Sequence, residues 1–484
     1  MTATIKRRDF IRQTAGTLGL LGLPGLYAPA AERTADTSGA RKPNLLFIFA
    51  DDQAFDSIGA LGCAEVQTPN LDRLVRRGVS FTNCYNQGGW GGAICVASRT
   101  MLVTGAFLWR AQELSAHMRD EAEAGRLWPQ YLERAGYRTY MSGKWHVNCK
   151  AADVFQITRN VRPGMPPDIP EQYNRPNEHE ADPFDPSDPS LGGFWTGGVH
   201  WSEALGDDGV AFLKDAAAQA APFFMYLAFN APHDPRQSPR EYQELYDLDA
   251  IGTPDNFQPL YPDKEAIGCG PDLRDERLAP FPRTEHAVRV QRREYYAIIS
   301  HMDAQIGRIL DALEETGQGD NTYILFTADH GLAVGRHGLM GKQNMYEHSL
   351  KAPLVLTGPG IPADQRLDGL VYLQDIAPTT LELAGVELPG QMRYKSLMPL
   401  IRGERDTNYD AVYGAYMDKQ RMVRQGRHKL IYYPNLERYH LFDLETDPNE
   451  MDNRIDDPRH APLVETLKAR LRALQEETGD VLSL

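Results

Sequence analysis

Acidic residues and a histidine follow two apolar runs of the sequence. Asp51 and Asp52 come directly after one run, and Asp329 and His330 come after another. Either group alone could cap a helix or pack in a turn. Two adjacent acids repel each other unless a cation neutralises them, and oxygen-rich sites suit Ca²⁺, Mg²⁺ or Mn²⁺. Together the two groups predict a divalent metal site.

Basic residues lie in further segments that could join this site. Lys144 and His146 are two positions apart, and His233 and Lys342 stand in separate segments. A single histidine after a strand is usually structural. Two histidines and two lysines beside a metal are typical of an anion site with acid and base groups. This set favours a tetrahedral oxyanion, either sulfate or phosphate.

The elements that must position these residues alternate along the chain. Apolar runs without polar alternation, at 44–50, 222–234, 322–331 and 353–360, predict strands that are buried on both faces. The segment 293–317 has apolar residues at helical spacing and ends on a glycine. Strands alternating with helices predict a doubly wound α/β fold, in which ligands bind beyond the carboxyl ends of the strands.

Two regions depart from this pattern. Residues 151–200 are rich in Pro, Asp and Glu and form either a wall of the site or an inert insertion. From residue 405 onward, short alternating strands and one helix predict a small antiparallel sheet with a packed helix. We therefore expect a catalytic α/β domain at 43–404 and a C-terminal α+β subdomain at 405–484.

The N-terminus is typical of an export signal. A basic stretch with the pair Arg7-Arg8 precedes an apolar segment and the small-residue site Ala28-Pro29-Ala30. We expect a twin-arginine signal peptide at 1–30, a linker at 31–42 and a periplasmic or secreted protein; the alternative is a buried N-terminal helix. The net charge of −15 argues against nonspecific nucleic-acid binding, and no run after the signal is long enough to span a membrane.

The chain has five cysteines, an odd number for an exported protein. One of them opens the segment 95–99, Cys-Val-Ala-Ser-Arg, which continues with Leu102 and Thr104-Gly105. This segment resembles the type I sulfatase motif C-x-[PA]-S-R with its L-x-T-G extension. The stretches "GKWH", "APHDP", "ADHG", "GRHG" and "HLFDLETDPNE" follow in the order of that family. The resemblance covers nearly the whole mature chain.

The resemblance implies a fold and a chemistry. The fold is that of the alkaline-phosphatase superfamily, a large, mixed, mostly parallel sheet sandwiched by helices. Cys95 is expected to be oxidised to Cα-formylglycine by a formylglycine-generating or equivalent maturase. Its hydrated aldehyde would supply one hydroxyl as the nucleophile, and the other would expel sulfate. A serine has no such second hydroxyl.

The resemblance also assigns roles by position. The implied metal ligands are Asp51, Asp52, Asp329, His330 and the modified Cys95. Arg99 would orient the nucleophile, Lys144 would bridge it to sulfate, and His146 would accept a proton. His233 would protonate the leaving alcohol, and Lys342 would hold the sulfate. His330 stands where many members have asparagine, and its softer imidazole could shift the metal preference from calcium toward manganese. Calcium remains the expected metal, with magnesium and manganese as alternatives.

The motifs specify the leaving alcohol less closely than the sulfate. We expect a sulfated polysaccharide or a derived oligosaccharide. The outer pocket would use His337, Gln343, Asn344, Trp195, Tyr432 and Asn435, although these residues could instead pack the domain junction. Two rival functions remain: a phosphonate monoester or phosphodiester hydrolase, and an unmodified homologue that binds sulfated glycans. The oligomeric state is not specified.

Overall fold

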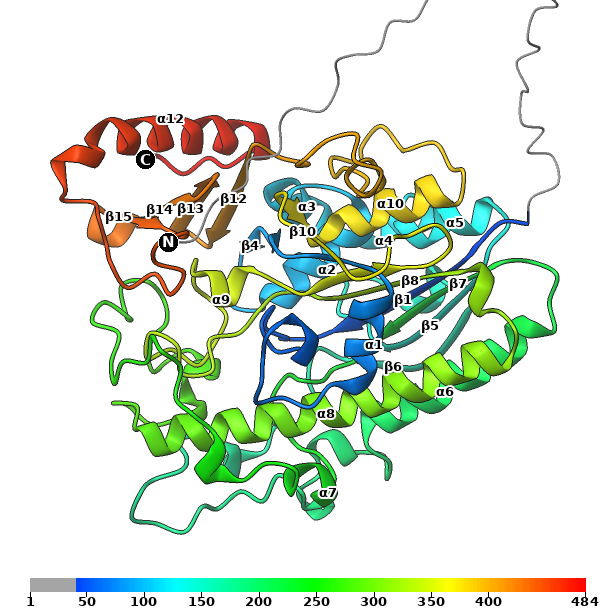
Figure 1. Cartoon of the computed structure of the whole chain (residues 1–484), viewed down its shortest axis with the longest axis horizontal. Coiled ribbons are helices and arrows are strands. Elements are labelled where there is room, and N and C mark those ends of the chain that lie inside the picture. Colours follow the sequence, from blue (N-terminus) through cyan, green and yellow to red (C-terminus); the bar gives the residue numbers. More distant parts are fainter. Residues whose placement is uncertain (1–40) are drawn as a thin grey trace, which may run out of the picture. The chain divides into compact units, whose positions relative to one another are not determined.

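An eight-stranded sheet lies at the centre of the computed structural model, which describes residues 41–484 (Figure 1). The expected signal peptide and most of the expected linker lie outside the described residues. The strand order is β10-β2-β9-β8-β1-β7-β5-β6. The strands are β1 (Asn44–Ala50), β2 (Val79–Phe81), β5 (Arg138–Lys144), β6 (Ile157–Arg162), β7 (Phe223–Ala228), β8 (Thr322–Ala328), β9 (Leu354–Thr357) and β10 (Gln365–Leu367).

The sheet is mixed and mostly parallel. β1 pairs in parallel with β7 and β8, and β5 continues the parallel set to β6. β9 forms within the predicted segment 353–360 but runs antiparallel to both β8 and β2. The large sheet thus confirms the predicted fold class, with the direction of β9 as a difference in detail.

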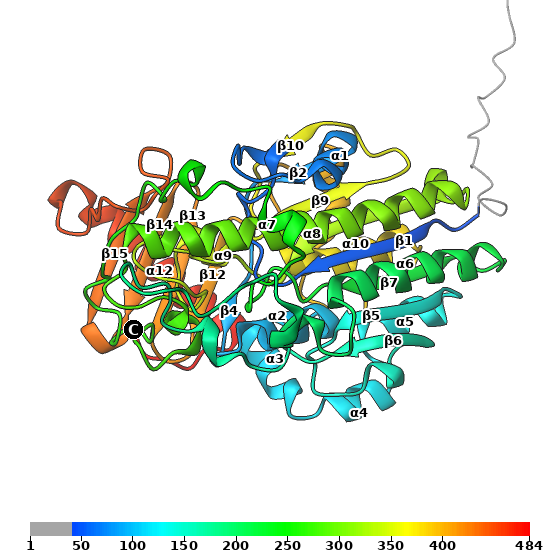
Figure 2. The same cartoon turned by 90° about the horizontal axis from the view of Figure 1, so that it is seen from below.

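Helices cover both faces of this sheet, as the uninterrupted apolar strands require. Every residue of β1 is buried. α6 (Trp201–Ala217) and α8 (Glu285–Glu315) run along one face, and α2 (Ile94–Thr104), α5 (Trp128–Arg134) and α10 (Ile376–Leu383) lie on the other (Figures 1 and 2). The remaining helices are α1 (Pro69–Arg77), α3 (Leu108–Ser115), α4 (Met118–Glu123), α7 (Arg240–Gln243), α9 (Glu347–Leu350), α11 (Met398–Ile401) and α12 (Ala461–Thr478).

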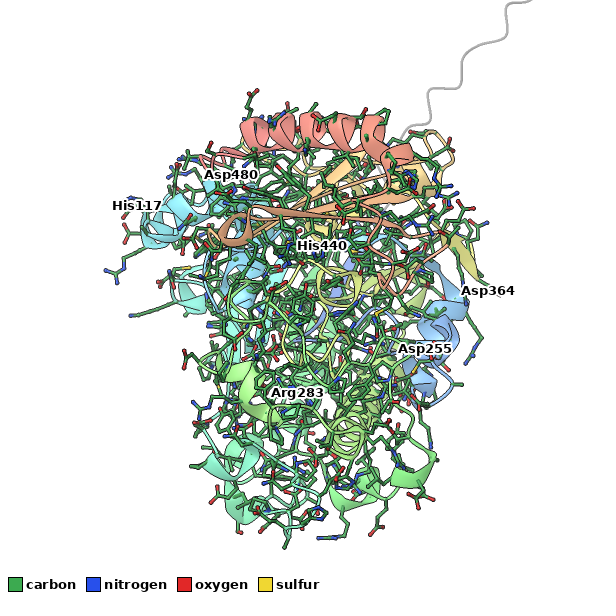
Figure 3. The ribbon with its side chains drawn as sticks, turned by 90° about the vertical axis from the view of Figure 1, so that its left-hand side faces the viewer. His117, Asp255, Arg283, Asp364, His440 and Asp480 are labelled. Carbon is green, nitrogen blue, oxygen red and sulfur yellow. The ribbon has the colours of Figure 1, made fainter. Side chains whose placement is uncertain are left out.

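A second sheet is formed by the C-terminal strands β12 (Ala411–Tyr416), β13 (Gln420–Gln425), β14 (His428–Tyr433) and β15 (Arg438–Asp443). They are antiparallel, and α12 packs against them; His440 and Asp480 lie below this helix in Figure 3. The sheet gains a fifth strand from outside the predicted subdomain, because β4 (Gly88–Gly89) pairs with β12. A Cβ at Gly88 would lie 2.0 Å from the Ala415 carbonyl oxygen, so this close pairing requires glycine.

The remaining short pair joins β3 (Cys84–Tyr85) to β11 (Val371–Tyr372). The segment 151–200 contributes β6 to the edge of the large sheet, a strand that the composition did not indicate. The five cysteines, all within the described range, form no disulfide. None of the helices within residues 41–484 combines the length and the apolar composition that a membrane span needs.

Lys429 of β14 holds two acids at the junction of the two sheets. Its Nζ lies 3.1 Å from Glu347 Oε1 and 2.7 Å from Glu450 Oε1, and all three side chains are buried. Because Lys429→Met leaves these carboxylates without their shared cation, we expect it to destabilise the protein by about 3 kcal/mol. A lowered Tm in thermal unfolding would show this. Lys214→Met, at an exposed lysine of α6, is the control, and equal Tm values for the two variants would contradict the prediction.

Candidate active site

The carboxyl ends of four neighbouring strands bring the predicted residues together. Asp51 follows β1, Lys144 is the last residue of β5, His233 lies beyond β7 and Asp329 follows β8. In the register of the sheet Ala50 pairs with Ala328, so Asp51 and Asp329 leave their strands side by side. The site therefore lies where a doubly wound sheet places its ligands.

Cys95 and Arg99 reach the same place from α2. Cys95 is in the first turn of this helix, and Arg99 is four positions later, on the same helical face. The glycine-rich segment before the helix is held by the pairing of β4 with β12. Because a helix N-terminus favours negative charge, this position suits an ionised side chain at residue 95.

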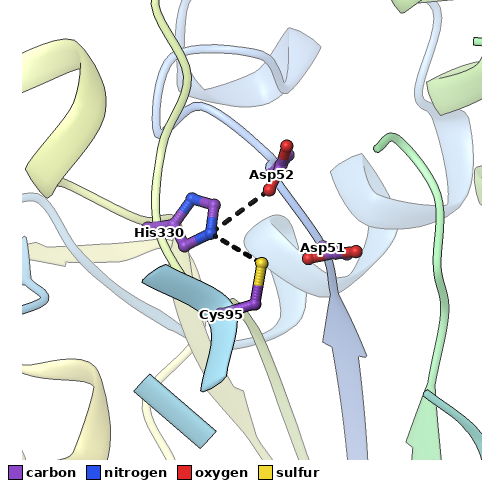
Figure 4. A group of neighbouring side chains, drawn as sticks. All are labelled: Asp51, Asp52, Cys95 and His330. Atoms are coloured by element: carbon purple, nitrogen blue, oxygen red, sulfur yellow. Dashed lines mark hydrogen bonds and ion pairs between the residues drawn. The ribbon is translucent and has the colours of Figure 1, made fainter. Parts of the chain in front are cut away.

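Four side chains form a cluster with the composition of a metal site. One donor atom from each of Asp51, Asp52, Cys95 and His330 lies within 4.8 Å of the others (Figure 4). His330 Nε2 is 3.4 Å from Cys95 Sγ and 3.2 Å from Asp52 Oδ1. Asp329 is adjacent rather than part of this cluster: its Oδ1 lies 3.4 Å from His330 Nε2 and accepts a hydrogen bond from the Asp52 amide.

The electrostatics of this cluster fit a bound cation. Asp51 is fully buried, and its Oδ1 has no hydrogen-bond partner among the described residues. Burial and the neighbouring charge of Asp329 hold the pKa of Asp51 well above its usual range. Burial opposes protonation of His330, but the charges of Asp329 and Asp52 raise its pKa to about 9. These carboxylates therefore favour additional positive charge, which a divalent ion with oxygen ligands and one imidazole would supply.

Buried cations surround the same acids. Lys144 Nζ donates to Asp51, and Lys342 Nζ lies 2.7 Å from Asp52 Oδ2. Arg99 Nε donates to Asp329 Oδ2 at 3.0 Å. Burial alone would raise the pKa of the Cys95 thiol, but the charges of Lys144, Lys342 and His330 lower it well below its usual range. The site thus stabilises an anion at the side chain of residue 95.

The two candidate proton-transfer histidines differ in their surroundings. Burial lowers the pKa of His146, and its ring packs against Gly164, where a Cβ would come within 2.3 Å of it. Burial also lowers the pKa of His233, whose Nδ1 lies 3.2 Å from Asp234 Oδ1 and whose Nε2 lies 3.9 Å from Asp52 Oδ2. Burial therefore favours the neutral form of both imidazoles in the protein without substrate.

A cavity of about 430 Å³ leads to this site. Its lining contains four of the predicted catalytic residues, together with residues from four segments, 92–93, 163–165, 273–275 and 343. The lining residues are Gly92, Ala93, Cys95, His146, Pro163, Gly164, Met165, His233, Leu273, Arg274, Asp275, Lys342 and Gln343. Part of the segment 151–200 therefore forms a wall of the site.

Of the six residues expected in the outer pocket, Gln343 lines the cavity. Its amide donates to the Gly92 carbonyl and to Asp275. Asn344 is buried beside it and does not line the cavity; its Oδ1 accepts from the Tyr346 amide.

The other four lie elsewhere because they pack against other groups. The His337 ring stacks on Tyr346 at 4.0 Å, and the Tyr432 ring stacks on Tyr439 at 4.4 Å. Trp195 packs edge-on against His200, and Asn435 Nδ2 donates to the Ala266 carbonyl. We therefore leave these four residues out of the proposed substrate site.

Several lining residues carried no signal in the sequence. Arg274 and Asp275 lie in a 3₁₀ segment, Arg274–Leu278, which has neither strand nor helix periodicity. Pro163 and Met165 belong to the proline-rich excursion. Asp234, which is buried and does not line the cavity, stands in the "APHDP" stretch, but its contact with His233 depends on the fold of that loop.

The comparisons with known proteins agree with this architecture. The family model described as Sulfatase matches residues 43–386, and that described as N-sulphoglucosamine sulphohydrolase, C-terminal, matches residues 335–477. A choline-sulfatase of Rhizobium meliloti is 32% identical over 86% of this chain and 83% of its own. An N-acetylglucosamine-6-O-sulfatase of Bacteroides thetaiotaomicron is 26% identical over 96% of this chain and 90% of its own.

Solved structures share the fold. One, a protein in complex with its substrate D-glucosamine-2-N,6-O-disulfate, has a TM-score of 0.70 at 24% identity and covers 91% of this chain and 99% of its own. The phosphonate monoester hydrolase from Silicibacter pomeroyi has a TM-score of 0.69 at 21% identity, with coverages of 91% and 96%. The matched domain extends over most of the chain and contains the whole residue cluster around Cys95, and the chain belongs to the sulfatase family of the alkaline-phosphatase-like superfamily.

Proposed function

We propose that this sulfatase removes sulfate from a sulfated carbohydrate, with Cys95 converted to Cα-formylglycine beside one divalent metal ion. The observation that carries this proposal is the position of Cys95. Its side chain lies at the N-terminus of α2, within 4.8 Å of ligand atoms from Asp51, Asp52 and His330, where nearby cations stabilise negative charge. These surroundings suit an ionised nucleophile and are unnecessary for a structural thiol.

The residues around this position would share the chemistry. Asp51, Asp52, Asp329 and His330 would hold the metal, which neutralises charge at the nucleophile and the sulfate. The hydrated aldehyde would supply one hydroxyl that attacks sulfur and a second whose deprotonation releases sulfate. Arg99 and Lys144 would orient that group, since Arg99 donates to Asp329 and to the Lys144 carbonyl.

Proton transfer would fall to the two histidines. His146, a neutral imidazole beside residue 95, would accept the proton whose loss releases sulfate. His233 would give a proton to the leaving oxygen. Its pKa is low in the free protein, but an anionic sulfate ester beside it stabilises the imidazolium and raises that pKa. Lys342 would hold the sulfate as charge develops on the leaving oxygen.

The cavity and the relatives support a carbohydrate as the alcohol. A cavity of about 430 Å³ is within the size range of pockets for small ligands. Its apolar side chains, Pro163, Met165 and Leu273, suit the C–H face of a sugar ring, and Arg274 and Gln343 offer polar groups to its hydroxyls. The relative from Bacteroides thetaiotaomicron is an N-acetylglucosamine-6-O-sulfatase, and one structural neighbour was solved in complex with its substrate D-glucosamine-2-N,6-O-disulfate.

A direct comparison of substrates tests this function. The purified, modified enzyme should release sulfate from at least one member of a panel of monosulfated hexoses and hexosamines. It should also hydrolyse 4-nitrophenyl sulfate faster than a 4-nitrophenyl phosphodiester. Faster phosphodiester hydrolysis would favour the phosphonate monoester or phosphodiester hydrolase, whose fold this chain shares.

Three further parts of the proposal concern the metal, the modification of Cys95 and export. Calcium is the proposed metal, because three of the four proposed protein ligands are carboxylates. A formylglycine-generating or equivalent maturase would modify Cys95 before export through the twin-arginine signal.

Replacing Arg7 and Arg8 with lysine is expected to leave active enzyme in the cytoplasm, as fractionation would show; unchanged export would contradict this route.

A further inference from the structure

The cavity wall beside His233 carries a guanidinium that two buried acids hold in place. Arg274 donates through Nη1 and Nη2 to the carboxylate of Asp234, and its Nη2 lies 2.6 Å from Asp275 Oδ1. Both acids are buried, whereas the Arg274 side chain keeps 29% of its surface exposed and lines the cavity. Arg274 therefore presents a fixed set of donors to whatever occupies this space.

The position of Arg274 places it on the alcohol side of the bond to be cleaved. Asp234 Oδ1 lies 3.2 Å from His233 Nδ1, so a single carboxylate separates the guanidinium from the proposed proton donor to the leaving oxygen. The proposed sulfate-holding Lys342 approaches the same wall from the other side, with its Nζ 3.5 Å from Asp275 Oδ2. A group beyond the leaving oxygen would thus meet Arg274.

The charges of this wall indicate what Arg274 can recognise. Asp234 and Asp275 together balance the positive charges of Arg274 and Lys342, and Lys342 also pairs with Asp52. A second anionic group of the substrate would therefore gain little here. A guanidinium has five N–H donors, of which the two acids take three and Tyr173 is a further partner. At least one donor remains for a neutral oxygen.

We propose that Arg274 determines substrate specificity by donating a hydrogen bond to a neutral hydroxyl on a carbon next to the sulfated carbon of the sugar. This inference rests on the proposed carbohydrate sulfatase function. Leu273 and Met165, which line the same cavity, contact the apolar part of any leaving group. An aryl sulfate has no such hydroxyl, so it uses only the apolar contacts. Arg274 therefore distinguishes sugar sulfates from aryl sulfates.

The test combines changes in the enzyme with changes in the substrate. Wild type, Arg274→Met and Arg274→Lys are assayed on the best monosulfated hexose of the panel, on its deoxy analogues at the carbons flanking the sulfated one, and on 4-nitrophenyl sulfate. Arg274→Met should lower kcat/KM for the hexose roughly 10- to 100-fold more than for the aryl sulfate. The same difference is expected against the deoxy analogue that lacks the hydroxyl bound by Arg274. Arg274→Lys keeps the positive charge but lacks the planar guanidinium, so its kcat/KM for the hexose should lie between those of wild type and Arg274→Met.

Arg277→Met is the matched control, because Arg277 is three positions away, exposed and absent from the cavity lining. Its kcat/KM should equal that of wild type for every substrate. Equal losses on all substrates for Arg274→Met would overturn this inference and leave the sulfatase function intact. If a substrate with a carboxylate in place of the hydroxyl is cleaved faster than the hexose, the claim that Arg274 binds a neutral hydroxyl is wrong. If no sugar sulfate is cleaved by a fully modified wild type, the carbohydrate assignment itself fails.

Discussion

Replacing Cys95 with alanine is expected to abolish sulfate release, with the fold nearly unchanged. Cys95 is buried in the first turn of α2 beside His330, and alanine fits there without strain. It has no atom that could attack sulfur and cannot become an aldehyde. We expect kcat/KM for 4-nitrophenyl sulfate to fall to background, while Tm stays within a few degrees of wild type.

Cys95→Ser separates the two hydroxyls of the proposed nucleophile. A serine oxygen can attack sulfur and release the alcohol, but it lacks the second hydroxyl that expels sulfate. The variant should therefore complete at most one turnover and gain the mass of one SO₃ group on the peptide that contains residue 95. Cys84→Ser, at a buried cysteine outside the cavity lining, is the control and should retain catalysis. Full multiple-turnover activity of Cys95→Ser would refute the nucleophile assignment.

Neutralising one proposed metal ligand is the second change with a large expected effect. Asp51 is fully buried, and one of its oxygens has no partner in the described part of the chain. Asp51→Asn keeps the shape of the side chain but removes its charge. Because metal stabilisation of developing charge is worth several kcal/mol, we expect kcat/KM to fall by at least about 1,000-fold.

Metal content distinguishes this loss from a general disturbance. The purified Asp51→Asn protein should hold much less than one divalent ion per chain by elemental analysis. Asp56→Asn is the control, since Asp56 pairs with Arg336 at 2.6 Å on a neighbouring segment and should keep both metal and activity. A full metal complement in Asp51→Asn would remove Asp51 from the ligand set.

The parts of the site that sequence alone predicted are those attached to regular elements. β1 and β8 are recognisable because each contains an uninterrupted apolar run, 45–50 in β1 and 323–326 in β8, and the acids stand directly after the strands. The register of parallel strands then brings Asp51 and Asp329 together without further information. Cys95 and Arg99 carried a motif signal, and their helical spacing puts both on the same face of α2.

The parts that sequence did not predict depend on long-range packing. The β4 pairing with β12 uses two glycines, which have no strand propensity and therefore give no signal. His337 and Tyr432 have the chemistry of sugar-binding residues, but aromatic partners from distant segments cover them. Arg274 lies in an irregular segment, and its contact with Asp234 exists only after the fold has formed.

The mass of the peptide containing residue 95, measured on enzyme purified from cells that export it, tests the central claim most directly. We predict that this peptide is lighter than the encoded sequence by the difference between a CH₂SH and a CHO side chain, and that the modified fraction follows specific activity across preparations. A fully active preparation in which residue 95 is an unmodified thiol would contradict the account.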